Sequence, residues 1–215
     1  MCRPFAHAVI CDFDGTITTV DTFWEFIDTV CEKEVIDSAM QRYRDGEISL
    51  IDAGLAMIES IPVSDLPRVD AYIETMTIRP GFDDFIRYLK EINVPLIVLS
   101  GGLHYTVKGK LAPYREFIHE IYSAKLDTSG EYLTVVSPCM EPRSYLDKST
   151  VLERLEAEVF IGIGDGCTDL SIADKCHHMF ARDKLLEYLR ENNLPYIGWN
   201  DFYDVIAHMK EHIFV

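Results

Sequence analysis

The sequence predicts an α/β protein, in which a Rossmann-like doubly wound parallel sheet carries an α-helical bundle inserted after its first strand. Strand-like and helix-like segments alternate from residue 78 to residue 215, which is typical of parallel sheets covered by helices. Residues 21–76 instead show helical periodicity without strand-like alternation. We therefore expect a core domain of residues 1–17 and 78–215, and a helical domain of residues 18–77.

The first predicted strand is the apolar run of residues 8–11, which Asp12 follows directly. A short apolar run that ends in a turn signal is typical of a buried strand. Asp12 and Asp14 stand two residues apart, and Gly15 follows them. In open α/β sheets, ligands bind outside the C-terminal ends of the strands. We therefore expect both carboxylates at a binding site on this edge of the sheet.

The inserted helices are predicted from apolar residues that recur at a spacing close to 3.6. Asp21 or Thr22 can cap the first helix. Asp45 and Gly46 interrupt the pattern, and Pro62 ends the next periodic stretch. A further amphipathic stretch continues to residue 76, so the inserted domain is predicted to be a small helix bundle.

The rest of the chain is predicted to alternate between helices and strands. Residues 94–99 and 159–163 are apolar on both faces, as buried parallel strands are. Residues 119–137 flank the turn Ser129-Gly130 and predict a pair of strands. In chain order we expect helix 82–92, strand 94–99, helix 105–111, the strand pair 119–137, a helix that begins at Lys148 after its cap Asp147, strand 159–163, a helix after Gly166, strand 178–181, helix 182–192, strand 195–198 and helix 201–212.

The composition limits the classes of partner. The chain has 36 acidic and 20 basic residues and a formal net charge of −16, whereas a nucleic-acid backbone requires a basic face. No apolar run approaches the roughly 18 residues of a membrane span, and the early strand leaves no room for a signal peptide. The six cysteines form no CxxC pair, which argues against disulfides or a zinc cluster. We expect a cytoplasmic monomer or homodimer without nucleic-acid or membrane partners.

Three predicted strands end at chemically active residues, which are Asp12, Ser100 and Asp165. Hydrolysis of a phosphate monoester requires a nucleophile, positive charge around the phosphoryl oxygens and a proton for the leaving oxygen. Asp12 is the candidate nucleophile, which would form an aspartyl-phosphate. Asp14 can protonate the leaving alkoxide and later deprotonate water. Ser100 and the amides after it can donate hydrogen bonds to phosphate.

Lys148 and a metal ion are expected to supply the positive charge. Asp165 and Asp169 form a carboxylate cluster with Asp12, which is costly unless a cation binds to it. Ligand sets made only of oxygen atoms suit Mg²⁺, so Mg²⁺ is the predicted cofactor. The cation would also explain how an acidic chain attracts a small phosphorylated metabolite. Each motif alone has a plain structural explanation, such as a turn at Asp14-Gly15, but their order along the chain favours chemistry.

In these motifs the chain resembles the phosphatases of the haloacid dehalogenase superfamily. The resemblance lies in four motifs in the order of that family, which are DFDGT (12–16), SGG (100–102), Lys148 and GDGCTD (164–169). It implies that Asp12 is the phosphorylated nucleophile and Asp14 the general acid/base. It also implies that Ser100 and Lys148 bind the phosphate.

The same resemblance implies a Mg²⁺ site. Asp12, the backbone carbonyl of Asp14 and Asp165 would hold the ion, and Asp169 would act as an outer ligand or through a metal-bound water. The residues expected to bind substrate are Thr16, Asp21, Gly101, Gly102 and Thr168.

The helical insert resembles the small α-bundle cap of the phosphoserine phosphatase-like subgroup, in which Asp21 would take the place of a Glu that recognises the substrate amine. Two features argue against phosphoserine as the substrate. Residues 50–61 contain no Arg or Lys for a substrate carboxylate, and Thr168 replaces the usual Asn. Residues 180–205 resemble the branch that includes the methionine-salvage phosphatase of 2-hydroxy-3-keto-5-methylthiopentenyl 1-phosphate.

The predicted function is that of a Mg²⁺-dependent phosphatase, which hydrolyses a small phosphorylated metabolite through an aspartyl-phosphate intermediate. A phosphotransferase or phosphomutase on the same scaffold, and phosphoserine phosphatase specifically, are the alternatives. Asp14 argues against a dehalogenase, because only phosphate-ester chemistry requires an acid at this position.

Overall fold

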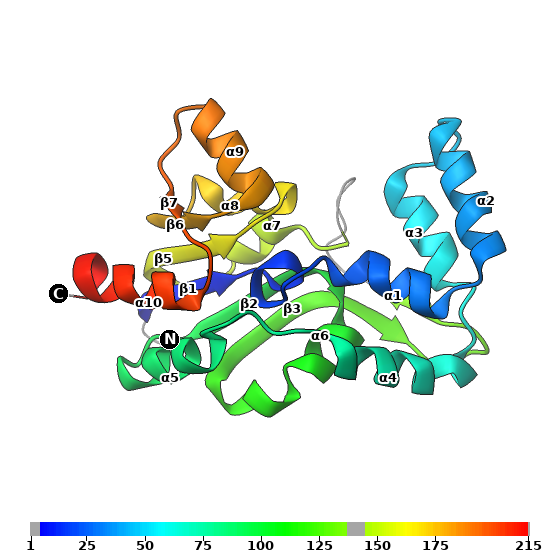
Figure 1. The fold of residues 1–215 in the computed structure, drawn as a ribbon, viewed down its shortest axis with the longest axis horizontal. Coiled ribbons are helices and arrows are strands. Elements are labelled where there is room, and N and C mark those ends of the chain that lie inside the picture. The colour runs from blue at the N-terminus through cyan, green and yellow to red at the C-terminus, as the bar shows by residue number, and fades with distance from the viewer. Residues whose placement is uncertain (1–4, 137–144, 215) are drawn as a thin grey trace.

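The computed structural model describes residues 5–136 and 145–214 of the chain. Seven strands form one sheet in the order β4-β3-β2-β1-β5-β6-β7 (Figure 1). All neighbouring strands in it are parallel except β3 and β4. The strands are β1 (Phe5–Cys11), β2 (Leu96–Leu103), β3 (Ile118–Asp127), β4 (Thr134–Val136), β5 (Ala157–Gly164), β6 (His178–Ala181) and β7 (Ile197–Gly198).

Helices cover both faces of the sheet because the side chains of each strand alternate between the faces. On β1, Cys11 packs into a cluster with Phe85 and Phe202, whereas Ile10 packs against Val151 on the opposite face. The first face carries α5 (Phe82–Glu91), α6 (His104–Lys110) and α10 (Phe202–His208), and the second carries α7 (Lys148–Leu152), α8 (Leu170–Ala173) and α9 (Asp183–Glu191). Short 3₁₀ turns lie at Val63–Asp65, Ala112–Phe117 and Cys167–Asp169, and a π turn at Met209–Ile213 follows α10.

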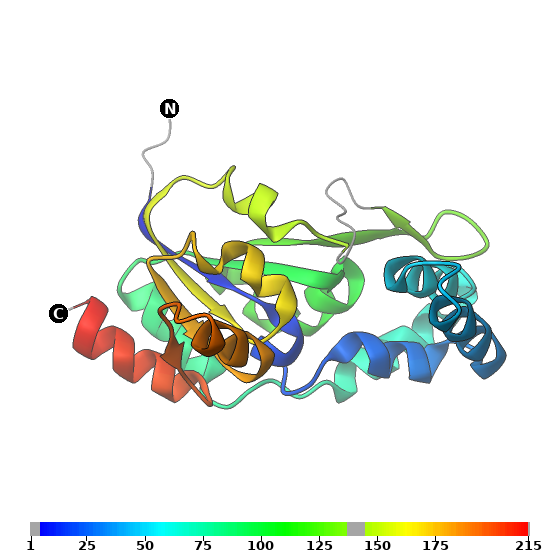
Figure 2. The same cartoon turned by 90° about the horizontal axis from the view of Figure 1, so that it is seen from above.

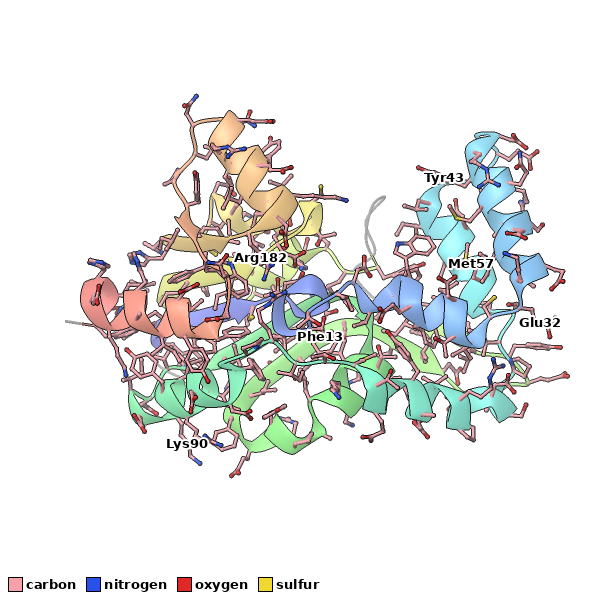
Figure 3. The ribbon with its side chains drawn as sticks, in the orientation of Figure 1. Phe13, Glu32, Tyr43, Met57, Lys90 and Arg182 are labelled. Atoms are coloured by element: carbon pink, nitrogen blue, oxygen red, sulfur yellow. The ribbon has the colours of Figure 1, made fainter. Side chains whose placement is uncertain are left out.

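Four helices lie between β1 and α5 in the chain, and two of them, α2 and α3, stand apart from the sheet at one end of the molecule (Figures 1 and 2). They are α1 (Thr22–Val30), α2 (Lys33–Arg44), α3 (Leu50–Ile58) and α4 (Leu66–Thr75). The side chain of Asp21 caps α1, and Ser49 caps α3 in a capping box with Asp52. Met57 is fully buried in this unit, whereas Tyr43 is exposed near the end of α2 (Figure 3).

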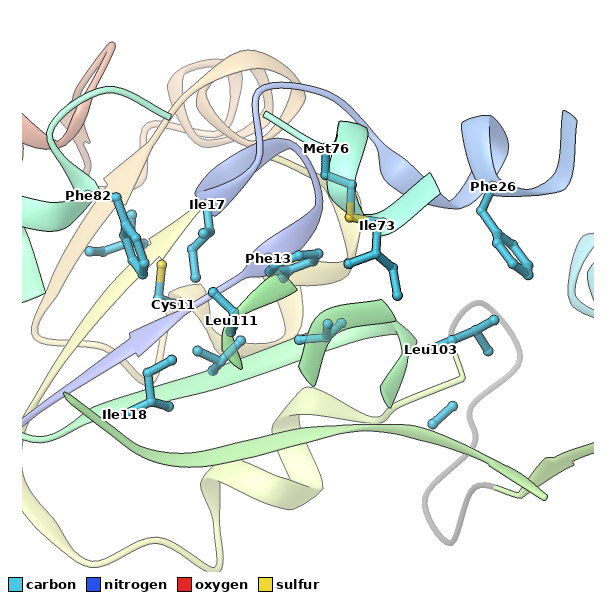
Figure 4. Close-up of a cluster of buried hydrophobic side chains, with 14 of the residues drawn as sticks. Cys11, Phe13, Ile17, Phe26, Ile73, Met76, Phe82, Leu103, Leu111 and Ile118 are labelled. Atoms are coloured by element: carbon cyan, nitrogen blue, oxygen red, sulfur yellow. The ribbon is translucent and has the colours of Figure 1, made fainter. Parts of the chain in front are cut away.

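One continuous hydrophobic cluster joins these helices to the sheet. Figure 4 shows Phe13 and Ile17 in this cluster, with Phe82 from α5 on one side and Phe26 from α1 on the other. All four side chains are at most 1% exposed. The predicted fold class, a Rossmann-like doubly wound parallel sheet with an inserted helix bundle, is therefore confirmed.

The chain crosses between the helices and the sheet through two segments that pair with each other. Thr18 and Ile78 form an antiparallel bridge, and the amide of Thr19 donates to the carbonyl of Thr77 over 3.0 Å. A second connection comes from the β3–β4 hairpin, where the amide of Leu133 donates to the carbonyl of Ile61 over 2.9 Å. The domain division at residues 17/18 and 77/78 falls on the paired crossing and stays a prediction.

The order of the strands places the ends of β1 and β5 side by side. From β1 the chain continues to β2 and β3 on one side of the sheet, and β5, β6 and β7 extend the other side. Cys11 and Ile163 are direct partners near the C-terminal ends of β1 and β5. Ligands of open α/β sheets bind at such a reversal of strand order. Asp12 directly follows β1 and Asp165 directly follows β5, so both lie at this point.

Two findings on membrane spans and on cysteines hold for the part of the chain that the structure describes. Among residues 5–136 and 145–214, no helix combines the length and the apolar character needed to cross a membrane. The cysteines described there, which are Cys11, Cys31, Cys167 and Cys176, are all free thiols.

Candidate active site

The loop after β1 turns sharply enough to bring its backbone against a second carboxylate. Gly15 has a φ of +75°, a conformation that favours glycine. A Cβ atom at this position would lie 2.5 Å from Oδ2 of Asp165. Thr16, next in the chain, is fully buried, and its hydroxyl donates to Oδ1 of Asp165 over 2.6 Å. The loop therefore fixes Asp165 beside Asp12 and leaves Thr16 below the surface of the site.

Lys148 lies at the centre of the carboxylate cluster. Its Nζ is 2.7 Å from Oδ1 of Asp12 and 2.7 Å from Oδ1 of Asp169, and its side chain is 1% exposed. Asp147 caps the short helix α7 by accepting from the amide of Thr150, as the sequence predicted. The N-cap at Asp147 and the packing of α7 against the sheet therefore place the ammonium group of Lys148 at the ends of two strands.

Asp169 has both carboxylate oxygens engaged. Oδ1 contacts Lys148, and Oδ2 accepts from the amides of Asp165 and Gly166, each over 3.1 Å. Asp169 is fully buried. A buried carboxylate with this number of donors holds the loop after β5 in one conformation. The outer role expected for Asp169 stays a prediction.

The residues present fit a divalent cation. Asp12, Asp165 and Asp169 each offer a carboxylate oxygen, and these three oxygens lie within 4.8 Å of one another. Hard oxygen ligands of this kind suit Mg²⁺. Because Asp169 already binds Lys148 and two amides, Asp12 and Asp165 are better placed for direct contact. The carboxylate of Asp14 is not part of this group, so its predicted contact falls to its backbone carbonyl.

The electrostatics of the cluster favour a cation. Burial raises the pKa of Asp12 well above its usual range, Asp169 adds to the rise and Lys148 opposes it. Burial also raises the pKa of Asp165 to about 6, against the hydrogen bond from Thr16. Burial alone would lower the pKa of Lys148, but Asp12 and Asp169 raise it overall, so the ammonium stays charged. One ammonium cannot balance three carboxylates, so the cluster attracts further positive charge.

Asp14 has different partners from Asp12. Its carboxylate accepts hydrogen bonds from the hydroxyls of Thr22 and Ser100, the latter over 3.1 Å. The hydroxyl of Ser100 in turn accepts from the amide of Gly102 over 2.9 Å. Burial raises the pKa of Asp14, while the hydrogen bonds from Thr22 and Ser100 oppose the rise. The two carboxylates therefore have separate environments, which suits separate chemical roles.

A cavity of about 400 Å³ opens above these groups. Its floor includes Asp12, Asp14 and Asp165, and its walls include other residues expected to bind substrate, which are Asp21, Gly101, Gly102 and Thr168. Ser100, Lys148 and Asp169 are at most 1% exposed and are not among the residues that line the cavity. Asp21 also accepts from the amide of Phe23 over 3.0 Å as the cap of α1. The roles of all these residues in catalysis and binding stay predictions.

Three residues that the sequence did not predict support or line the site. Arg79 is 7% exposed and donates to the backbone carbonyls of Gly15, Thr16 and Thr18. Thr22 donates to Asp14, and Tyr145 lines the cavity. Arg79 lies in the predicted break before α5. A single sequence does not reveal that an Arg is buried or which backbone carbonyls it contacts.

Comparisons with known proteins give a matching family and named relatives. A family model for haloacid dehalogenase-like hydrolases matches residues 9–174. The chain is 34% identical over 199 residues to a 2-hydroxy-3-keto-5-methylthiopentenyl-1-phosphate phosphatase of Microcystis aeruginosa, with 92% of this chain and 94% of that protein covered. It is 32% identical over 212 residues to a protein of the same name from Bacillus mycoides strain KBAB4, with 94% and 95% covered.

Solved structures share the fold at lower identity. A phosphoserine phosphatase with a phospho-aspartyl intermediate analogue aligns with a TM-score of 0.71 at 18% identity, over 96% of this chain and 99% of that chain. A haloacid dehalogenase family hydrolase from Salmonella enterica serovar Typhi gives a TM-score of 0.71 at 18% identity, over 98% and 73%. The resemblance found in the sequence is thus confirmed over most of the chain. The chain belongs to the haloacid dehalogenase-like hydrolase family.

Proposed function

We propose that this hydrolase is a Mg²⁺-dependent phosphatase, which cleaves a small phosphorylated metabolite through an aspartyl-phosphate at Asp12. Its class, phosphoric monoester hydrolase, follows from the family model and from the phosphatase relatives. The observation that carries the proposal is the 2.7 Å contact between Lys148 Nζ and Asp12 Oδ1 beside the carboxylates of Asp165 and Asp169. A nucleophile and cationic charge at one point are what attack on a phosphate monoester requires.

In the first step, an oxygen of Asp12 attacks phosphorus and the ester oxygen leaves. Lys148 holds the Asp12 carboxylate in position and contributes positive charge next to the phosphoryl oxygens. The amide of Gly101, which lines the cavity, donates to those oxygens, whereas the amide of Gly102 holds the hydroxyl of Ser100. A bound Mg²⁺, held by Asp12, Asp165 and the carbonyl of Asp14, would neutralise part of the phosphoryl charge.

Asp14 moves the protons of both steps. It gives a proton to the leaving alkoxide, and it then takes a proton from the water that attacks phosphorus of the aspartyl-phosphate. The second step releases inorganic phosphate and restores the Asp12 carboxylate. Thr22 and Ser100 orient the Asp14 carboxylate for this transfer.

The metabolite that we propose is of the kind named for the relatives, 2-hydroxy-3-keto-5-methylthiopentenyl 1-phosphate. The proposed cap, residues 18–77, supplies Asp21 and the apolar side chains of α1 and α3 to the cavity wall, so we assign substrate selection to it. Phosphoserine is disfavoured, because no Arg of the described residues lines the cavity to receive its carboxylate. A phosphotransferase would use the same first step and differ only in the acceptor.

The proposal is tested with a panel of phosphorylated metabolites assayed with Mg²⁺, including the ester named above, phosphoserine and sugar phosphates. We expect release of inorganic phosphate from the first, and no phosphoryl transfer to added alcohols. Asp12→Asn is expected to abolish turnover with every substrate while the circular dichroism spectrum stays unchanged. Steady-state turnover by Asp12→Asn, or transfer to an alcohol in place of hydrolysis, would reject the proposal.

A further inference from the structure

Five apolar side chains form one wall of the cavity that holds Asp12 and Asp14. They come from three separate segments, which are Phe23 and Trp24 on α1, Leu50 and Ile51 at the start of α3, and Tyr145 three residues before Lys148. We propose that this apolar wall is a subsite for the part of the substrate remote from the phosphate, and that it selects a short aliphatic or thioether chain. The inference rests on the proposed function and deepens it.

The aromatic members of the wall pack against one another. The ring of Phe23 meets that of Trp24 at 5.3 Å between centroids in an edge-to-face arrangement, and it lies 5.9 Å from that of Tyr145. The hydroxyl of Tyr145 also donates to the backbone carbonyl of Ile51 over 3.3 Å. These contacts fix rings from two different parts of the chain in a single surface. Flat aromatic surfaces accept both aliphatic carbon and thioether sulfur.

Gly54 makes room for Tyr145. It lies within helix α3, where glycine is less favourable than alanine. Its lack of a side chain is explained by the packing around it. A Cβ atom at Gly54 would lie 2.1 Å from the hydroxyl oxygen of Tyr145 and 3.2 Å from Cζ of Phe23. The helix therefore has a notch that receives the end of the Tyr145 side chain. Tyr145, which belongs to the predicted core domain, therefore contacts the helical insert at the cavity.

The exposure of Leu50 favours an apolar ligand group in this part of the cavity. It is 42% exposed although it lines the cavity, and an apolar chain bound there would remove it from water. The charged residues around the cavity are mostly acidic, among them Asp21 and Asp183, and Lys184 is the cation among the described lining residues. A second anionic group on the substrate is therefore disfavoured, whereas an uncharged chain is not.

The direct test is a series of n-alkyl monophosphates from methyl to butyl, assayed with Mg²⁺. Since kcat/KM reports the interaction gained on the path to the transition state, we expect it to rise about fourfold for each methylene that the wall buries. A series that is flat or falls with chain length overturns the apolar subsite and leaves the phosphatase proposal standing. No release of phosphate from any ester, p-nitrophenyl phosphate included, overturns the phosphatase proposal and the subsite with it.

A matched pair of leucines shows whether the wall is responsible. Leu50 and Leu194 are both 42% exposed, and Leu194 lies outside the cavity lining. We expect Leu50→Ala to lower the ratio of kcat/KM between butyl and methyl phosphate at least twofold, and Leu194→Ala to leave it unchanged. An equal effect of both variants, or of neither, contradicts the assignment of Leu50.

The notch at Gly54 has its own test and rescue. Gly54→Ala is expected to displace Tyr145 rather than unfold α3, because the added methyl group meets only the ends of two side chains, the hydroxyl of Tyr145 and, less closely, Cζ of Phe23. The butyl-to-methyl ratio should fall at least twofold with the melting temperature nearly unchanged. Removing the hydroxyl in Gly54→Ala/Tyr145→Phe should restore the ratio, since Cζ of Tyr145 lies 3.4 Å from the added methyl group. An unchanged ratio in Gly54→Ala, or no recovery in the double variant, contradicts the role of Tyr145.

Discussion

Two aspartates separated by one residue have unlike surroundings in this site. Asp12 contacts the ammonium of Lys148, whereas Asp14 accepts from the hydroxyls of Thr22 and Ser100. An anion beside a fixed cation suits a nucleophile, and a carboxyl group held by neutral donors suits an acid that gives and takes a proton. The difference in partners therefore supports the proposed division of roles.

At the residue scale, Asp14→Asn separates protonation of the leaving group from nucleophilic attack. We expect kcat for alkyl phosphates to fall by about 10²–10⁴-fold, because an alkoxide leaves poorly without a proton. The loss for p-nitrophenyl phosphate should be much smaller in the first step, since nitrophenolate leaves without help. Rapid-quench measurement of alcohol and nitrophenolate release compares the two, with Asp28→Asn on the exposed side of α1 as the control. Equal losses for both esters would count against the acid role.

The sequence predicted these carboxylates because the C-terminal ends of parallel strands meet at one edge of a sheet. Asp12 and Asp165 follow predicted strands and Lys148 begins a predicted helix, whereas Ser100 lies within β2, which continues beyond the predicted end at residue 99 to Leu103. The local pattern holds no information on pairs such as Tyr145 and Gly54, whose contact depends on how the inserted helices lie over the sheet.

At the scale of elements, the loop after β1 depends on one distant side chain. The guanidinium of Arg79 donates to the carbonyls of Gly15 and Thr18 and, over 2.7 Å, to that of Thr16. Arg79 belongs to the returning segment that pairs with residues 17–19. It therefore ties together the loop after β1 and both crossings between the sheet and the helical insert.

Arg79→Lys keeps the charge but removes the planar fork of donors. Each buried carbonyl left without a partner costs about 1–3 kcal/mol, so we expect the free energy of unfolding to fall by about 2–4 kcal/mol. A loop displaced by a fraction of an ångström should also lower kcat about tenfold or more. Arg68→Lys is the control, because Arg68 also donates to a backbone carbonyl, that of Thr29, but lies on α4 away from the loop. Urea unfolding and steady-state rates of the two variants decide the matter, and equal effects would refute the role of Arg79.

The elements themselves were largely predictable, and their mutual contacts were not. Periodicity and caps indicated most of the helices but not the break at Cys31 and Glu32 that separates α1 from α2. The caps Asp21 and Asp147 are confirmed. The strand pair after residue 118 is also confirmed as β3 and β4. Its hydrogen bond to Ile61 of the helical insert escaped prediction, because a single bridge between two irregular segments leaves no periodic pattern.

At the scale of the whole molecule, a strongly acidic chain must bind an anion. The net charge of −16 opposes a phosphorylated substrate, and the buried carboxylates beside Lys148 add to this field. A divalent cation bound between Asp12 and Asp165 would reverse the local potential at this edge of the sheet. Binding of the metal and binding of the substrate should therefore be linked.

Metal removal tests this linkage. Chelation of Mg²⁺ should abolish turnover, and at a free Mg²⁺ concentration about 100 times Kd the free energy of unfolding should rise by about 2.7 kcal/mol. For a chain of this size, that is an increase of about 5–10 °C in Tm. Asp165→Asn should lose most of the increase, whereas Asp174→Asn, at an exposed position outside the cluster, should keep it. An identical Tm response in the two variants would place the ion elsewhere.

The measurement that bears most directly on the central claim is identification of the residue phosphorylated during turnover. The wild-type enzyme is quenched with acid in the steady state, and its peptides are examined by mass spectrometry with and without borohydride reduction. The proposed mechanism predicts one phosphoryl group on the peptide that contains Asp12, and conversion of that residue to homoserine by borohydride. A phosphoryl group on any other residue, or the same labelling in Asp12→Asn, would contradict it.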